Sequence, residues 1–191
     1  MLRQILLFVI DSVCGFFTLA LLARFALQWA RAPFRNPLGQ FVIAVTDWML
    51  RPVRPLVPGL FGLDMASLLL AWLWQVVNQG LALGLSGVFA VVAPAPALVV
   101  AVLAAIELLR MGLYLVFGAV LIAAIFSWVN PYAPMAALFD ALTRPLLRPF
   151  RRLIPPVGGV DLSPLVLLLV LQIALFVLAT LRNGVLPAII F

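Results

Sequence analysis

The sequence predicts an all-α integral membrane protein with four transmembrane helices in two parallel tandem repeats, each with a cytoplasmic amphipathic interfacial helix and an Arg-Pro turn. Of its 191 residues, 66% are apolar and 9% are charged, whereas soluble domains have roughly 45–50% and 25%. A soluble globule of this size could not cover so much apolar surface. The composition therefore excludes a soluble domain, a disordered chain and a disulfide scaffold. Four apolar segments and an internal repeat complete the prediction.

Four segments reach the length of about 20 mostly apolar residues that a membrane span requires; they are residues 5–29, 65–85, 98–128 and 165–186. The first is predicted to be a retained span rather than a signal peptide, because its apolar run is too long and only Arg3 precedes it. Residues 87–105 contain Pro94 and Pro96, which disfavour a straight helix, so the second and third spans are separated at 86–97. A loop, a re-entrant segment and a helical extension all stay open for 87–105.

The linkers 30–64 and 129–163 are rich in Pro and Arg, and each begins with an amphipathic helical pattern. In the first linker Asn36 can cap the helix and Pro37 suits its first position. Apolar residues fall on one face of each helix: Leu38, Phe41, Val42, Val45 and Met49 in the first, and Met135, Leu138, Phe139, Leu142 and Leu146 in the second. Both helices are predicted to lie in the membrane interface before a Pro-rich turn enters the next span.

An offset of 97 residues superimposes the second half of the chain on the first. Residues 49–54 (MLRPVR) fall on residues 146–151 (LLRPFR). Further matches follow in the same order: Pro58 with Pro155, Gly62 with Gly159, Asp64 with Asp161 and Gln75 with Gln172. Each unit crosses the membrane twice, so both copies face the same way and form parallel rather than inverted repeats. We divide the chain into a first repeat, 1–93, and a second repeat, 94–191.

The arginines indicate the orientation, since the chain has 12 Arg and no Lys. Eight lie in the two linkers, whereas Arg3 and Arg182 lie on the other side. The positive-inside rule therefore places both linkers in the cytoplasm and both termini outside. A basic chain can also bind nucleic acid. Arg beside membrane spans is better explained by topology and by anionic lipid headgroups, so direct contact with nucleic acid is not expected.

The residue inventory argues against catalysis. The chain has no His and a single Cys, Cys14. It therefore supplies no Ser-His-Asp triad, no His-ligated zinc or haem and no iron–sulfur site. We expect no enzyme, no cofactor and no metal site. A membrane-embedded enzyme would need a carboxylate pair, and the acids within the spans, Asp11 and Glu107, are predicted to lie near the outer surface.

Ionisable residues within spans are functional candidates because burying a charge in lipid is costly. Asp11, Glu107 and Arg110 are placed near the outer boundary, and Arg182 reaches the same level from the last span. Arg110 can pair with Glu107 three residues earlier, and Arg24, near the cytoplasmic boundary, can extend its side chain to the interface. Two acids and two Arg at one depth predict a neutral cluster that pins the helices together; the alternative is an ion or proton path.

The polar residues near the middle of the spans are amides. Gln75 and Gln172 are repeat equivalents, and Asn78 extends the polar patch on the second span. Amides in lipid hydrogen-bond across helices and hold them together. The alternative is that Gln75 and Gln172 line a small polar site at the pseudo-twofold axis.

The candidate partner- or lipid-binding residues recur in both linkers; they are Arg51, Arg54, Asp64, Arg148, Arg151, Arg152 and Asp161. We call residues 51–64 and 148–161 the two elbows. Each Asp precedes a returning span, where it can cap the helix or pair with an Arg of its own elbow. In the structural interpretation, Arg sets the orientation and Asp caps. In the functional one, the elbows form a basic platform that Pro holds in a fixed conformation.

The second elbow pattern, residues 147–164 (LRPFRRLIPPVGGVDLSP), resembles the YggT family of small membrane proteins. The first copy is looser: Phe61 stands where the second has Gly158, and 66–67 (AS) stand where the second has 163–164 (SP). The resemblance covers almost the whole chain and implies no established enzymatic activity. Plastid relatives resemble factors for cytochrome b6 maturation and organelle DNA organisation. Bacterial relatives are linked to cell division, or to osmotic tolerance and potassium handling.

The sequence therefore favours a non-catalytic scaffold or assembly factor of the inner membrane that contacts partners through its elbows. The expected partners are membrane lipids, preferably anionic, and other membrane, division or assembly proteins; a homo-oligomer stays open. The alternative is a small oligomeric channel or transporter for ion or osmotic homeostasis, based on the intramembrane polar residues.

Overall fold

The computed structural model describes residues 1–59, 62–87, 96–130, 132–133, 135–154 and 161–190, with side chains as far as residue 184. These residues form six α-helices and no strand: α1 (Leu2–Trp29), α2 (Pro37–Val53), α3 (Met65–Ser86), α4 (Pro96–Val129), α5 (Ala136–Leu153) and α6 (Ser163–Ile190). The predicted all-α class is confirmed, and each predicted span corresponds to one of these helices.

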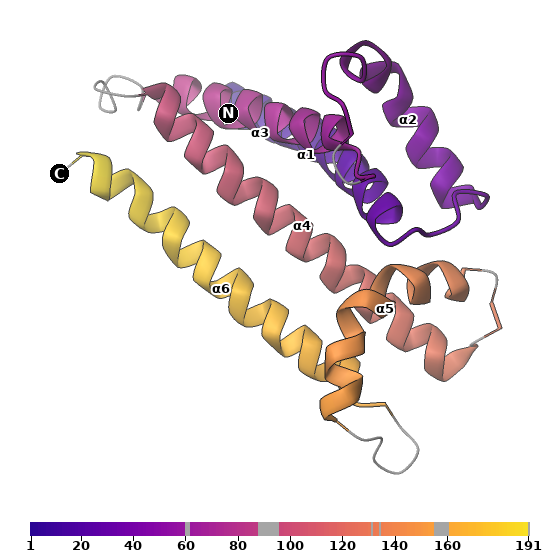
Figure 1. The fold of residues 1–191 in the computed structure, drawn as a ribbon. Helices are drawn as coiled ribbons and strands as arrows, with labels where there is room; N and C mark the ends of the chain where they lie inside the picture. The colour runs from indigo at the N-terminus through magenta and orange to yellow at the C-terminus, as the bar shows by residue number, and fades with distance from the viewer. Residues whose placement is uncertain (60–61, 88–95, 131, 134, 155–160, 191) are drawn as a thin grey trace.

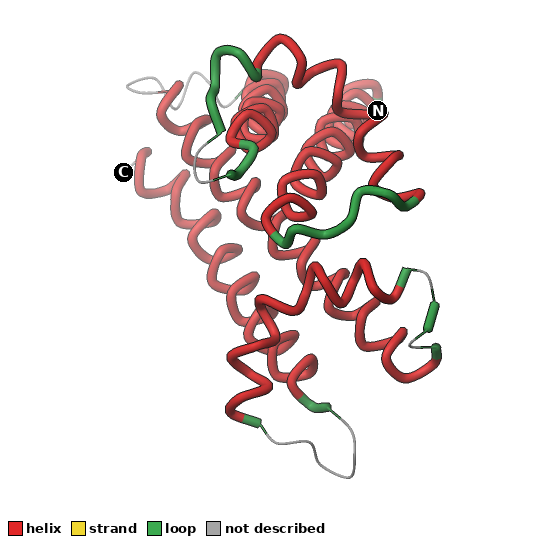
Figure 2. The backbone as a smooth tube through the Cα atoms, turned by 45° about the vertical axis from the view of Figure 1, so that its right-hand side comes forward, coloured by secondary structure: helices red, strands yellow, loops and turns green. Residues whose placement is uncertain are grey.

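Four of the described helices, α1, α3, α4 and α6, are long and apolar enough to cross a membrane. They run alongside one another, with α3 packed against α1 and α4, and α4 packed in turn against α6 (Figure 1). The N-terminus and the end of α6 lie at one end of this bundle, while α2 and α5 lie at the other (Figure 1). Figure 2 shows the C-terminus and the bent helix α5 at opposite ends. Both linker helices are thus at the same end, as parallel repeats require.

Each half has its own small apolar core at the linker end of the bundle. In the first half, Leu50 of α2 is fully buried against Leu21 of α1 and Ala71 of α3. In the second half, its repeat equivalent Leu147 of α5 is buried with Val120 of α4. These leucines anchor the linker helices to the spans. The boundary between the halves at 93/94 lies outside the described residues.

The helix α2 begins as its sequence predicts, because the Asn36 side chain accepts a hydrogen bond from the Gly39 N–H at 2.8 Å and Pro37 occupies the first position. Its predicted apolar face is divided between two surroundings. Val42 and Met49 are buried on the spans, whereas Phe41 is 53% exposed. The helix therefore contacts the bundle with one side and presents apolar side chains outward with another, as an interfacial helix does.

The helix α5 changes direction along its length (Figure 1). It contains Pro145 and Pro149, and a proline inside a helix removes a backbone hydrogen bond and kinks the axis. The bend carries the chain from the end of α4 to the start of α6.

The structure settles part of the segment left open at 87–105. Gly87 ends α3 in the left-handed conformation, with φ of 75°, which glycine adopts without steric cost. The helix α4 begins at Pro96, so residues 96–105 are helical and extend the third span. Pro96 is tolerated there because the first residues of a helix have no intrahelical N–H partner. Pro94 lies outside the described residues.

Candidate functional site

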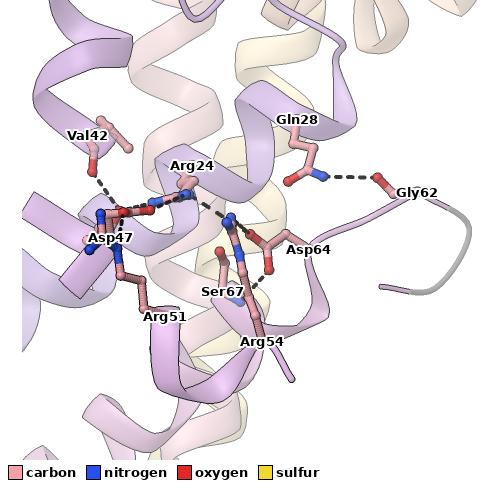
Figure 3. A network of polar contacts seen from close by, with 10 residues as sticks. Arg24, Gln28, Val42, Asp47, Arg51, Arg54, Gly62, Asp64 and Ser67 are labelled. Carbon is pink, nitrogen blue, oxygen red and sulfur yellow. Dashed lines mark hydrogen bonds and ion pairs between the residues drawn. The ribbon is translucent and has the colours of Figure 1, made fainter. Parts of the chain in front are cut away.

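A polar network joins α1, α2 and α3 at the linker end of the first repeat (Figure 3). Its centre is Arg24, which is only 6% exposed. The Arg24 guanidinium donates from Nη1 to Thr46 Oγ1 at 2.8 Å and from Nη2 to Asp47 Oδ1 at 3.1 Å. Its Nε lies 4.0 Å from Asp64 Oδ2. One α1 side chain therefore holds the linker helix and the start of the returning span together.

Asp64 connects the elbow to α3. Its Oδ1 accepts from the Ser67 N–H at 3.2 Å, which caps the helix, and its Oδ2 accepts from Arg54 Nη2 at 2.9 Å. Asp64 thus both caps the helix and pairs with an arginine of its own elbow. Burial raises the pKa of Asp64, but the hydrogen bonds from Arg54 and Ser67 outweigh it, so the pKa lies below its ordinary value.

Asp47 completes the network on α2. Its second oxygen accepts from Arg51 Nε at 3.0 Å, and the hydrogen bonds from Arg24 and Arg51 lower its pKa. Nearby, Gln28 donates to the carbonyl of Gly62 at 3.2 Å. We call Arg24, Thr46, Asp47, Arg51, Arg54, Asp64 and Ser67 the Arg24 network. Its three Arg and two Asp leave a net charge of +1.

Acid is expected to weaken both elbows. The pKa of Asp161 is also lowered, since hydrogen bonds from Ser163 and Arg151 outweigh the effect of burial. A carboxyl group whose folded pKa lies below its unfolded value of about 3.9 stabilises the fold above that value. This stabilisation is lost as the pH falls through the folded pKa. The melting temperature in phosphatidylcholine nanodiscs should stay constant from about pH 7 to 5 and fall below about pH 4; a steep loss between pH 7 and 5 would contradict this.

The second elbow repeats only part of the network. Arg151 Nε donates to Asp161 Oδ2 at 2.8 Å, and the Ser163 N–H donates to Asp161 Oδ1 at 2.9 Å. On α5, Arg144 pairs with Asp140 at 2.6 Å. At the offset of 97 residues the position of Arg24 is occupied by Leu121. The arginine at the centre of the first site therefore has no counterpart in the second.

Arg148 and Arg152 are exposed, and within the described part of the chain neither forms an ion pair. Arg51 is also 80% exposed, although it pairs with Asp47. Each elbow thus pairs one arginine with its own Asp, Arg54 with Asp64 and Arg151 with Asp161. The other elbow arginines, Arg51, Arg148 and Arg152, are exposed.

Arg24, Thr46 and Asp47 were not among the site residues predicted from the sequence. The expectation that Arg24 extends to the interface is wrong, because its side chain is buried among hydrogen-bond partners. One signal was present in the sequence: an arginine inside a span needs a counter-charge. Asp47 lies on the linker helix that follows the same span, one residue beyond the repeated Thr46.

At the opposite end of the bundle, Glu107 of α4 pairs with Arg110 Nη2 at 2.9 Å and lies 3.8 Å from Arg182 Nε of α6. Asp11 does not join them among the described residues. Its Oδ1 accepts from Asn78 Nδ2 at 3.0 Å, which links α1 to α3. The predicted single neutral cluster is therefore wrong, because the two acids serve different helix pairs.

The two glutamines also lie in different surroundings. Gln75 is 1% exposed, and its Nε2 lies 3.1 Å from Thr18 Oγ1 and 3.1 Å from the Met111 sulfur. Gln172 is exposed on α6. The hypothesis that both line a small polar site at the pseudo-twofold axis is therefore wrong. The physical reason is that Thr18, the partner on α1, corresponds to Leu115 on α4, which offers no hydrogen bond.

The chemistry available in these sites is charge pairing and hydrogen bonding. Within the described residues, no three His, Cys, Asp or Glu side chains gather in a way that could hold a metal ion.

Comparison with known proteins gives a family match in two regions. The CCB3/YggT family model matches residues 3–85 and 102–182, which correspond to the two halves and confirm the tandem repeat. The chain is 38% identical to "Uncharacterized protein YggT" of Escherichia coli (strain K12), over 88% of this chain and 86% of that protein. It is 38% identical to "Uncharacterized protein PA0392" of Pseudomonas aeruginosa, over 87% and 84% respectively. No solved structure matches the chain.

Proposed function

The chain belongs to the CCB3/YggT family, and from the geometry of its elbows we propose that it is a non-catalytic scaffold or assembly factor of the bacterial inner membrane. It contacts a partner protein or anionic lipid through its paired elbows, which face the cytoplasm. The observation that carries this proposal is a set of outward-facing arginines on elbows that ion pairs hold in place.

The support comes from how each elbow is constrained. Arg54–Asp64 and Arg151–Asp161 each join residues ten apart in the chain, at 2.9 and 2.8 Å. Each pair ties the end of a linker helix to the start of the returning span. Arginines beside such a tie lose less conformational entropy on binding than arginines on a free loop. Two basic surfaces at one end of the bundle suit an anionic lipid surface or an acidic partner segment.

Replacing the unpaired arginines of the second elbow should weaken lipid binding. Each Arg near an anionic surface contributes about 1 kcal/mol, so R148Q/R152Q should bind phosphatidylglycerol about 30-fold more weakly. Native mass spectrometry of the purified protein measures the retained lipid. Crosslinking in native membranes, followed by co-purification, measures the loss of a protein partner.

The matched control is R31Q/R35Q, which removes the same charge from exposed linker positions outside the elbows. This variant should retain both lipid and partner. If both double variants weakened lipid and partner binding equally, the effect would come from the total charge of the linkers rather than from the elbows, which would contradict the proposal.

The proposed orientation has a direct test. Leu56 and Leu153 are repeat equivalents and are 79% and 80% exposed. In a Cys14→Ala background, L56C and L153C should both resist a membrane-impermeant thiol reagent in intact cells and react after the inner membrane is permeabilised. Arg3→Cys, at the other end of the bundle, should react in intact cells. Labelling of L56C and L153C from opposite sides would contradict the parallel arrangement.

The second candidate, a small oligomeric channel or transporter, is favoured by one observation. Gln172 is an exposed amide on a helix long and apolar enough to span the membrane, and such a group gains by hydrogen-bonding to another helix. Gln172 supports association of α6 with a partner helix or a second copy under either function. Ion flux in liposomes that disappears in Gln172→Leu would favour the channel over the scaffold.

A further inference from the structure

The second repeat contains a cavity of about 480 Å³ between α4, α5 and the start of α6. Its lining includes Thr143, Leu147, Arg151 and Asp161. At the offset of 97 residues, these residues correspond to four of the first repeat, namely Thr46, Leu50, Arg54 and Asp64. The cavity is therefore lined by the equivalents of Thr46 and Asp64, which contact the Arg24 guanidinium in the first repeat, and of Arg54, which shares Asp64 with it.

The second repeat has no arginine at the position that corresponds to Arg24 of the first repeat. Leu121 replaces Arg24 at the repeat offset. If Trp29, the last residue of α1, is aligned with Trp128, the last residue but one of α4, Ala123 takes that position instead. Ala123 lines the cavity, and Leu121 is 43% exposed. Neither side chain can supply the hydrogen bonds and charge that Arg24 gives to α2 and α3.

The aspartates of the second repeat are more exposed to solvent than Asp64, as expected without a central arginine. The Asp64 side chain is 7% exposed under Arg24, whereas that of Asp161 is 37% exposed. Asp140 also lines the cavity and is 41% exposed. Asp47 follows Thr46 by one residue and Asp140 precedes Thr143 by three, so the two acids point within about 40° of each other around their helices. Each cavity carboxylate pairs with an arginine of its own linker, as in the first repeat. Among the residues that the structure describes, neither pairs with a second, central cation.

The rest of the lining suits a guanidinium group. The lining residues also include three aromatic ones, Phe126, Trp128 and Tyr132. A guanidinium stacks on aromatic faces, bonds to carboxylates through a planar fork and sheds its hydration more easily than an ammonium. The lining holds two carboxylates, Asp140 and Asp161, against one arginine, Arg151, which favours a cation. The equivalence with the Arg24 site indicates which cation, a guanidinium.

We propose that the cavity of the second repeat binds the guanidinium group of an arginine side chain that another polypeptide supplies. This arginine completes from outside the network that Arg24 completes within the first repeat. The inference deepens the proposed scaffold function and rests on it for the source of the arginine: one repeat is closed by its own residue, and the other is left open for a partner's.

The first test uses butylguanidinium with the purified full chain in nanodiscs of phosphatidylcholine and phosphatidylglycerol. Butylguanidinium should raise the melting temperature saturably, butylammonium should do so at higher concentration, and the neutral butylurea should not. Ala123→Arg, which fills the cavity from within, should abolish the response. If that variant does not fold, Asp140→Asn should weaken binding at least tenfold. Equal responses to butylguanidinium and butylurea, or a full response in both variants, would overturn the proposal.

A matched variant tests the same chemistry in the first repeat. Arg24→Ala empties the counterpart site and should lower the melting temperature of the variant. Butylguanidinium should restore part of this loss, and it should bind to two sites in the variant rather than one. A one-site isotherm unchanged from that of the parent chain would show that these residues do not select a free guanidinium and would overturn the argument from equivalence.

Two further experiments distinguish whether a lipid headgroup or a polypeptide supplies the cation that occupies the cavity. Phosphatidylethanolamine carries an ammonium headgroup, so competition by it for the butylguanidinium site would assign the cavity to lipid and overturn the polypeptide source. A photocrosslinker at Ser127, which lines the cavity, should attach to a peptide whose Arg→Gln substitution removes the crosslink. A crosslink indifferent to that substitution would also overturn it. Probe binding without any loss of partner in R148Q/R152Q would instead count against the proposed function of the elbows alone.

Discussion

Arg24→Met is expected to lower the free energy of unfolding by about 3 kcal/mol, because removing one member of a buried ion pair leaves the other without full compensation. This loss is at the lower end of the usual range for breaking a buried ion pair, because Asp64 remains paired with Arg54 and Asp47 remains paired with Arg51. Methionine retains most of the volume, so the loss reports on charge and hydrogen bonds rather than on a cavity. Urea unfolding in mild detergent measures it.

The control is Arg35→Met, which removes an exposed linker arginine and should change stability by less than about 0.5 kcal/mol. A double-mutant cycle with Asp47→Asn isolates the pair and should show that the effects of the two substitutions are not additive. An Arg24→Met protein as stable as the parent chain would mean that the guanidinium does not hold the linker helix.

Leu50→Ala should lower the free energy of unfolding by a similar amount, about 2–5 kcal/mol, because it removes a fully buried side chain and leaves a void. Leu50 is 0% exposed and packs on Leu21 and Ala71 from the two flanking spans. The loss should detach α2 from the bundle while the spans stay associated. Hydrogen exchange of residues 37–53 measures this detachment separately from global unfolding.

The second repeat supplies an internal comparison. Leu147→Ala should cost less than Leu50→Ala, since Leu147 already borders the cavity of about 480 Å³ and its loss adds less new void. Leu56→Ala and Leu153→Ala, at exposed equivalent positions, should each change stability by less than about 0.5 kcal/mol. Equal losses at Leu50 and Leu147 would contradict the difference in packing between the repeats.

The parts of the site that were predictable are those whose partners lie close in the chain. Asn36 and Asp64 accept hydrogen bonds from N–H groups three residues later, at Gly39 and Ser67. Glu107 and Arg110 are likewise three apart. A residue pattern predicts such contacts because helix geometry alone brings the groups together.

The Arg24 network and the fate of the two glutamines were not predictable in this way. Arg24 and Asp47 are 23 residues apart, and Gln75 and Thr18 are 57 apart. Their contact depends on how α1 is rotated against α2 and α3, which follows from side-chain packing along the whole interface. The repeat predicted equivalent surroundings for Gln75 and Gln172, but Gln75 is buried and Gln172 is exposed.

Composition, hydropathy and the 97-residue offset were enough to establish four apolar helices, two like halves and linker helices at one end of the bundle. These properties depend on how many apolar residues each segment carries and on their spacing, which tertiary contacts do not alter. The difference between the halves came from packing across helices. Arg24 fills the first linker site and Leu121 leaves the second open, because a charge or a cavity acquires its partners only when helices distant in the chain are brought together.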